Sequence, residues 1–203
     1  IACYGNANER TPHLDALAWR GTMFANAYKP VPNCVPARAA FAAGHYEHWD
    51  NATPYTGEPL SSGHRLQAAV VEVGSIGKLH YRNSEDSVGL DFQLMPMHVV
   101  NSFDDVLGRI REPLSKRWKS HTMAEKIGAV DTRYTAYDRN IANAAAQWLE
   151  HKAEEASDQP WVLFVSLLAP HFPLIAPQEY FDLYSDLGLM PGKAEPKLND
   201  EHP

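Results

Sequence analysis

Cysteines, long apolar runs and an excess of basic residues are all missing or scarce in this chain of 203 residues. Two cysteines are too few for a disulfide-rich scaffold, and no apolar stretch approaches the roughly 18 residues that cross a bilayer. Lysine and arginine number 18 against 25 aspartates and glutamates, so the net charge of −7 offers nucleic-acid phosphates no extended basic stripe. We therefore expect no disulfide scaffold, no membrane insertion and no nucleic-acid partner.

What the chain does contain is the composition of a globular protein. Hydrophobic residues make up 44% and charged residues 21%, which argues against disordered and fibrous classes. At roughly 150 residues per domain, the length fits one domain or a part of one. Ile1 is not an initiator methionine and the last residues form no closing element, so we expect a piece of a longer domain, incomplete at both ends.

Capping and helix-breaking residues predict two helices in the first fifty positions. Thr11 followed by Pro12 predicts an N-cap and a helix over about 12–20, which Gly21 ends. Three prolines between 30 and 36 then exclude regular structure, and the alanine-rich run at 37–43 predicts a helix that starts near residue 35. A rigid loop therefore leads into the N-terminus of the second helix.

Apolar periodicity predicts strands and further helices in the rest of the chain. A short helix near 66–69 precedes an alternating strand at 71–76. Apolar residues between 141 and 149 have the spacing of an amphipathic helix, and the unbroken apolar run at 161–168 predicts a central parallel strand covered on both faces. Residues 85–135 show little periodicity, so we interpret them as loops and short helices.

The order of these elements predicts both the fold class and the place of a site. Helix, strand, helix and strand in succession indicate an α/β fold with a mainly parallel central sheet flanked by helices. Ligands bind such sheets outside the carboxyl ends of the strands. Lys78 and His80 follow the first predicted strand, and His171 follows the second. We therefore expect these three side chains near one edge of the sheet.

Cys34 and Arg38 lie at the predicted start of the second helix. Free N–H groups there favour negative charge, and Arg38 projects about one turn along the same face, so the pair suits an anionic substrate. Taken singly, the residues also have simpler interpretations. Cys34 is compatible with a small buried thiol and Arg38 with a surface charge, while lysines and histidines in loops are often merely exposed or hydrogen-bonded.

Several motifs resemble those of one enzyme family. The stretch Cys-Val-Pro-Ala-Arg at 34–38 is similar to the sulfatase signature of Cys or Ser, any residue, Pro, a small residue and Arg. The segments at 11–21, 77–80 and 169–173 resemble the blocks that precede and follow that signature in sulfatases, in the same order. On this resemblance the chain is identified as a member of the sulfatase family, within the alkaline-phosphatase-like superfamily.

The resemblance also implies which part of the family's domain is at hand. The family's first strand would precede Ile1 and its C-terminal part would follow Pro203, so residues 1–203 would be the N-terminal portion of a single catalytic domain. Alone, this portion is expected to be inactive. The segments 63–82 and 50–52 look more like choline-sulfatase-type bacterial enzymes than lysosomal arylsulfatases. The bacterial cytoplasm and periplasm are the compartments we favour, and homo-oligomerisation is left open.

The chemistry implied by the resemblance is hydrolysis of a small-molecule sulfate ester. A formylglycine-generating enzyme would oxidise Cys34 to formylglycine, whose hydrate is a geminal diol. One hydroxyl attacks the sulfur and expels the alcohol; the other then loses its proton, so that the carbonyl re-forms and inorganic sulfate leaves. Arg38 would hold and polarise the diol, and Lys78 would bind diol and sulfate oxygens. His80 would take the proton, and His171 would contact the sulfate near the leaving oxygen.

A divalent metal ion is implied as well, Ca²⁺ in most members of the family, with Mg²⁺ or Mn²⁺ as alternatives. Of its ligands only Cys34, after conversion, lies in this chain, because the family's paired aspartates precede Ile1 and its later Asp with Asn or His follows Pro203. Two alternatives stay open. One is a phosphonate or phosphate ester hydrolase of the same superfamily, and the other is a catalytically silent homologue that binds anions.

Overall fold

The computed structural model describes residues 1–45, 54–100 and 127–188. Its first helices precede three strands, and a long helix separates these from two further strands. In chain order they are η1 Ala2–Tyr4, α1 Pro12–Arg20, α2 Cys34–Ala43, α3 Ser62–Ala68, β1 Glu72–Lys78, β2 Phe92–Met97, β3 Ile127–Ala129, α5 Arg133–Glu154, β4 Trp161–Ser166, β5 Leu174–Ala176, α6 Gln178–Asp182 and η5 Ser185–Leu187. None of the helices in these ranges combines the length and the apolar character needed to cross a membrane.

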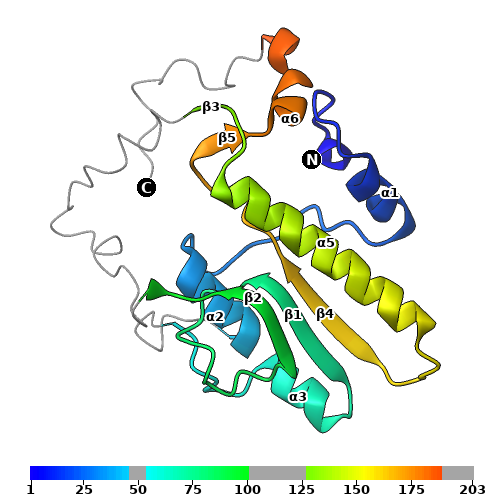
Figure 1. Ribbon diagram of the computed structural model, residues 1–203, viewed down its shortest axis with the longest axis vertical. Coiled ribbons are helices and arrows are strands. Elements are labelled where there is room, and N and C mark those ends of the chain that lie inside the picture. The colour runs from blue at the N-terminus through cyan, green and yellow to red at the C-terminus, as the bar shows by residue number, and fades with distance from the viewer. Residues whose placement is uncertain (46–53, 101–126, 189–203) are drawn as a thin grey trace, which may run out of the picture.

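The main sheet is parallel, and in the described residues its strand order is β2-β1-β4 (Figure 1). The register pairs Gly77 of β1 with Ser166 of β4, and Lys78 of β1 with Met97 of β2. The carboxyl ends of the three strands therefore meet at one edge of the sheet. A second, two-stranded parallel sheet joins β3 and β5. The predicted α/β class with parallel strands is confirmed.

Helices cover both faces of the main sheet. Ile141 and Ala145 of α5 pack in one buried cluster with Ile76 of β1, and Leu163 of β4 packs against that cluster. Alanines of α2 form the other cluster, against which Phe164 packs. Because Leu163 and Phe164 are adjacent on one strand, their side chains point to opposite faces. α5 and α2 therefore lie on opposite sides of the sheet, as the flanking helices of an α/β fold do.

The predicted helices are confirmed with small differences at their ends. α1 spans Pro12–Arg20 as expected, α2 begins at Cys34, and α5 extends well beyond the predicted amphipathic stretch. The cap of α1 differs from the prediction, because the Thr11 side chain bonds no N–H group of the first helical turn. Its hydroxyl oxygen instead accepts a hydrogen bond from the Ala2 N–H at 3.0 Å and donates one to Asp15 at 3.1 Å.

The interpretation of residues 85–135 as loops and short helices is wrong for β2 and β3, which are strands. Residues 101–126 of that segment lie outside the described residues. β2 has a weak strand signal because Pro96 interrupts it. Proline is tolerated in a strand at the edge of a sheet, where one side of the backbone has no ladder to complete.

The predicted central strand at 161–168 is also corrected. β4 ends at Ser166 and lies at an edge of the sheet in the described part of the chain, where β1 occupies the centre. Trp161, Val162 and Val165 are 40–42% exposed, so β4 is not covered on both faces by those residues. An apolar run records which side chains avoid water, but it does not record how many strands lie beside it.

Candidate active site

Cys34 is the first residue of α2, whose N-cap is Asn33. The Asn33 side-chain oxygen accepts a hydrogen bond from the Val35 N–H at 3.3 Å, and the Asn33 carbonyl accepts one from the Ala37 N–H at 3.1 Å. The thiol itself is free and half-buried. The helix dipole and the unpaired N–H groups of a first turn favour negative charge, so the side chain at position 34 lies where an anion is stabilised.

Arg38 lies one turn further along α2 and joins this helix to the sheet. Its Nη1 donates to the Lys78 carbonyl oxygen at 2.5 Å, and its Nη2 donates to Ser166 Oγ at 3.0 Å. Burial lowers the pKa of Arg38, while the nearby ionisable groups of Tyr81, Cys34 and Tyr137 oppose that effect. The guanidinium is therefore held at a fixed place by the ends of β1 and β4, and it is not the surface charge that the simpler interpretation proposed.

Lys78 ends β1 and is only 4% exposed. Burial lowers the pKa of its ammonium group, and Arg38 lowers it further, whereas Cys34 raises it. Within residues 1–45, 54–100 and 127–188, no carboxylate forms an ion pair with Lys78. A buried ammonium group without a carboxylate partner favours a bound anion. The interpretation of Lys78 as an exposed turn lysine is therefore wrong.

His80 follows β1 with a φ of 56°, in the left-handed region that non-glycine residues rarely adopt. Its N–H donates to the Met97 carbonyl oxygen at 2.6 Å, which fixes the residue beside the end of β2. Burial lowers the pKa of His80 to about 4, with further lowering by the cations of Lys78 and Arg38 and then by the two other histidines, His171 and His98. The ring is therefore neutral at pH 7.

His171 lies in the loop after β4 and is exposed. Its Nδ1 is 2.8 Å from the Phe172 carbonyl oxygen, and its ring lies 4.8 Å from the Phe172 ring. His171 is among the groups that lower the pKa of His80, after burial, Lys78 and Arg38. Among the described residues, however, no hydrogen bond joins the His171 side chain to the other predicted site residues.

Four of the five predicted residues form one group linked by electrostatic interactions, and His171 lies apart from it in the sequence. Cys34, Arg38 and Lys78 interact electrostatically in every pairing, and both cations act on His80. His171 lies in a separate loop, after β4, and its side-chain hydrogen bond is local, to the Phe172 carbonyl oxygen. α2, β1 and the segment after β4, which are distant in sequence, therefore bring a thiol, two cations and two imidazoles to the carboxyl edge of one parallel sheet.

Two further residues belong to this arrangement although the motifs do not include them. Ser166 is 6% exposed and accepts the second Arg38 hydrogen bond. Tyr137 donates to the Met95 carbonyl oxygen at 2.6 Å, and its pKa is raised by burial and by Asp138 but lowered by Arg38. Their signals were weak: Ser166 is the only polar residue in the apolar run at 161–168, and Tyr137 precedes a buried helix position by four residues.

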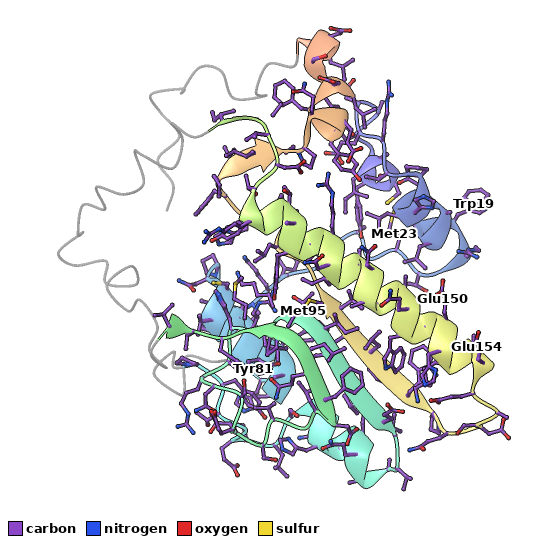
Figure 2. The ribbon with its side chains drawn as sticks, viewed as in Figure 1. Trp19, Met23, Tyr81, Met95, Glu150 and Glu154 are labelled. Atoms are coloured by element: carbon purple, nitrogen blue, oxygen red, sulfur yellow. The ribbon has the colours of Figure 1, made fainter. Side chains whose placement is uncertain are left out.

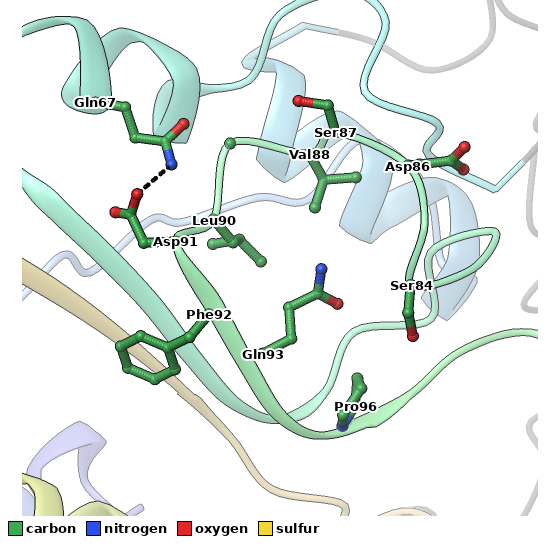
Figure 3. Close-up of a pocket in the computed structure, with 11 residues that line it drawn as sticks. Gln67, Ser84, Asp86, Ser87, Val88, Leu90, Asp91, Phe92, Gln93 and Pro96 are labelled. Atoms are coloured by element: carbon green, nitrogen blue, oxygen red, sulfur yellow. Dashed lines mark hydrogen bonds between the residues drawn. The ribbon is translucent and has the colours of Figure 1, made fainter.

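Two cavities of the molecule differ in whether a predicted site residue lines them. A cavity of about 330 Å³ is bordered by His171 and Asp138, together with the start of α5 and β5. Another cavity, of about 400 Å³, lies between α3, the segment 84–91 and β2 (Figure 3), and none of the five predicted residues lines it. Its Asp91 already accepts hydrogen bonds from Gln67 at 2.8 Å and from the Val73 N–H at 2.7 Å. Of the five predicted residues, His171 alone lines the first cavity, and the other four lie outside its lining.

The metal ion that the resemblance implies finds no ready-made site in the described residues. There, no three or more side chains of His, Cys, Asp or Glu lie close enough together to hold a cation. Calcium needs about six to eight oxygen ligands, which Cys34 cannot provide alone. These residues therefore do not fit a metal centre by themselves.

A family model and a curated relative both assign the chain to the same family. The family model described as Sulfatase matches residues 1–187. The choline-sulfatase of Rhizobium meliloti (strain 1021) is 31% identical over an alignment of 185 residues that covers 86% of this chain and 36% of that protein. The chain therefore spans little more than a third of the length of this curated relative.

Solved structures support the fold. One protein in complex with its substrate D-glucosamine-2-N,6-O-disulfate has a TM-score of 0.62 at 22% identity, over 94% of this chain and 35% of that chain. The phosphonate monoester hydrolase of Agrobacterium radiobacter has a TM-score of 0.57 at 22% identity, over 90% of this chain and 40% of that chain. At such identities the likeness concerns the fold alone.

Proposed function

Because this chain belongs to the sulfatase family, we propose that it contributes the nucleophile and the anion-binding cations of an enzyme that hydrolyses sulfate monoesters. The observation that supports the proposal is the meeting of Cys34, Arg38 and Lys78 where α2 begins and β1 ends. A helix N-terminus, one buried ammonium group and one half-buried guanidinium group around one thiol form a binding place for a compact anion. In this proposal residues 1–203 remain the N-terminal portion of one catalytic domain.

The surroundings of Cys34 fit the formylglycine that the family resemblance implies. The side chain is half-buried at the first position of a helix, and it interacts electrostatically with both Arg38 and Lys78. Hydrated formylglycine supplies two hydroxyl groups on one carbon, one to attack sulfur and one through which sulfate is released. Arg38, fixed by its bonds to β1 and β4, orients this group. Lys78 binds sulfate oxygens and stabilises the charge that develops on them.

The two histidines divide the proton handling. His80 is neutral at pH 7 because burial and the neighbouring cations hold its pKa at about 4, so it can accept the proton that accompanies sulfate release. Its Nδ1 is sealed from solvent and has no hydrogen-bond partner among the described residues, which leaves Nε2 as the atom for that proton. His171 is exposed beside the cavity, where it can contact the sulfate near the leaving oxygen.

The divalent metal ion that the resemblance implies would take only position 34, after conversion, as a ligand from residues 1–203. Calorimetric titration of residues 1–203 with Ca²⁺ is expected to show no tight stoichiometric binding, because the described residues hold no cluster of ligands. The isolated 203 residues are likewise expected to be inactive. Tight calcium binding to this chain alone would contradict that part of the proposal.

The function is tested in the full-length protein produced together with a formylglycine-generating enzyme. Mass spectrometry of the peptide that contains Cys34 is expected to show an aldehyde, and the protein is expected to hydrolyse 4-nitrophenyl sulfate. Cys34→Ala removes the nucleophile and is expected to abolish turnover, by about 10⁴-fold or more. Cys3→Ala is the matched control, since this second free cysteine lies near α1 rather than in α2.

Two results would replace the proposal with its alternatives. Preferential turnover of a 4-nitrophenyl phosphonate ester would identify a phosphonate hydrolase, the class to which one of the structural relatives belongs. Binding of inorganic sulfate without turnover of any ester, in protein whose Cys34 is fully converted, would identify a silent anion-binding homologue.

A further inference from the structure

The carboxylate of Asp138 accepts two backbone hydrogen bonds from the segment that leads from β4 to His171. Its Oδ1 accepts the Leu168 N–H at 2.7 Å, and its Oδ2 accepts the Ala169 N–H at 2.8 Å. Both oxygens of the side chain are therefore engaged, by donors about thirty positions away in the sequence. Hydrogen bonds to an ionised carboxylate are stronger than those between neutral groups. The contact ties the start of α5 to the loop after β4.

These bonds act on the short span between the strand and the histidine. β4 ends at Ser166, and Pro170, which has no N–H to donate, precedes His171. The His171 N–H donates to the Leu168 carbonyl oxygen at 2.9 Å. Leu168 is therefore held through its N–H by Asp138, and through its carbonyl it holds His171. The place of the histidine follows from the place of the carboxylate.

α5 does not need Asp138 in order to pack on the sheet. Ile141 and Ala145, which are 0% and 7% exposed, fasten the helix to Ile76 of β1. Asp138 is half-buried and, together with His171, borders the cavity of about 330 Å³. The two carboxylate bonds therefore act on the loop and on the wall of this cavity, whereas the apolar contacts fix the helix.

We propose that Asp138 is a positioning residue of the candidate active site: it fixes the loop after β4 so that His171 faces the substrate. The inference rests on the proposed function for what His171 does, but not for where His171 lies. A displacement of a reacting or binding group by about 1 Å can cost up to about 100-fold in rate. Asp138→Ala is therefore expected to lower kcat about 10- to 100-fold, with a smaller change in KM.

The test is a double-mutant cycle in the full-length protein, with kcat for 4-nitrophenyl sulfate measured for wild type, Asp138→Ala, His171→Ala and the double variant. If Asp138 acts through His171, Asp138→Ala has little further effect once His171 is alanine. Asp138→Asn, which keeps one acceptor oxygen, is expected to restore part of the rate. An equal loss in both backgrounds would overturn the inference.

The matched control is Glu150→Gln, which removes a carboxylate from an exposed position of the same helix (Figure 2). It is expected to leave kcat unchanged. A loss as large as that of Asp138→Ala would mean that the rate responds to the charge of α5 as a whole, and the positioning role would be wrong.

Amide hydrogen exchange separates failure of this inference from failure of the proposed function, since it needs no substrate. In the Asp138→Ala variant, faster exchange at Leu168 and Ala169 with an unchanged melting temperature supports the inference. Unchanged exchange at these two amides would overturn it even in an active enzyme. If exchange rises while the wild-type protein hydrolyses no sulfate ester, the proposed function fails but the anchoring of the His171 loop stands.

Discussion

The two halves of the candidate active site are built in different ways. Arg38 and Lys78 belong to α2 and β1, lie largely inside the protein, and have pKa values that burial lowers. His171 stands exposed on a loop after β4. The first half is positioned by the packing of a helix on a sheet. The second half is positioned by the two hydrogen bonds that Asp138 accepts.

Because of this difference, the two halves are expected to be sensitive to different kinds of substitution. In the buried half, side chains are locked by close backbone approach, so an added methyl group disturbs them. In the exposed half, side chains can change without steric conflict, but the position of the loop after β4 depends on the single carboxylate of Asp138. If a substitution in the buried half were harmless, or one in the exposed half disturbed the packing, the two halves would not differ in this way.

After removal of the nucleophile itself, the largest effect on activity is expected from Arg38→Ala in the full-length protein. The change removes the fork that bonds the Lys78 carbonyl and Ser166 and that lies beside the nucleophile. Loss of one preorganised charge-stabilising group costs roughly 10²- to 10³-fold in kcat. Kinetics with 4-nitrophenyl sulfate measure this loss.

Two arginine variants sharpen the result. Arg38→Lys keeps the charge but cannot donate two parallel hydrogen bonds, so it is expected to recover only part of the rate. Arg139→Ala removes an exposed arginine whose ion pairs with Asp131 and Glu179 lie on the surface, and it is expected to leave kcat unchanged. Full activity of Arg38→Ala would show that the buried half is not catalytic.

The next largest effect is expected on stability, from Gly77→Ala in β1. Gly77 has a φ of +100°, and a Cβ there would lie 2.2 Å from the Ser166 carbonyl oxygen and 2.7 Å from Ile141 Cδ1. Strain and overpacking of this kind cost about 2 to 4 kcal/mol of unfolding free energy. Thermal or denaturant unfolding of the full-length protein measures the loss.

Gly128→Ala in β3 is the matched control on the side of the exposed half. A Cβ at Gly128 would meet no atom within 4 Å, and its φ is not in the left-handed region. The substitution is expected to change the unfolding free energy by no more than about 0.5 kcal/mol. Equal losses for the two glycines would contradict the view that only the buried half is tightly packed.

Local sequence patterns predicted the elements well where local physics decides them. Pro12 and Gly21 mark the ends of α1, and the alanine-rich run is part of α2. They did not predict β2, whose Pro96 obscures it, or the edge position of β4. Strand order depends on neighbours that come from elsewhere in the chain, and a short window of sequence does not contain them.

The candidate site shows the same limit. Motif resemblance selected Arg38 and Lys78, but not the partner that holds Arg38 in place. The bond from Arg38 to Ser166 joins residues 128 positions apart, and the bonds of Asp138 cross about thirty. Such contacts arise only when the sheet and α5 have formed. The sequence motifs therefore named candidate side chains for the chemistry, which stay a prediction, but they did not name the residues that orient those side chains.

A smaller effect is expected from pH, through His80 of the buried half. Its pKa is about 4 in the folded protein, because of burial, Lys78, Arg38 and the two other histidines, against an ordinary value near 6.5 when unfolded. Between these values the unfolded chain binds the proton and the folded protein does not. Stability is therefore fully present above about pH 6.5 and is lost as the pH falls towards 4.

Histidine NMR titration of the full-length protein checks this expectation directly. The His80 resonance is expected to titrate near pH 4, and His80→Gln is expected to flatten the dependence of unfolding free energy on pH between 4 and 6.5. A midpoint near 6.5 for His80 would mean that neither burial nor the cations lower its pKa, and the electrostatic link within the buried half would be lost.

The smallest effect is expected on stability from His171→Ala in the exposed half. The ring is exposed, and its contacts are local: the Phe172 carbonyl at 2.8 Å from Nδ1 and the Phe172 ring at 4.8 Å. The bond that anchors the loop is made by the backbone N–H of residue 171, which alanine keeps. The unfolding free energy should therefore change by less than about 0.5 kcal/mol, while activity falls. A loss as large as that of Gly77→Ala would show that the loop is part of the packed core, and the two halves of the site would no longer differ in how they are built.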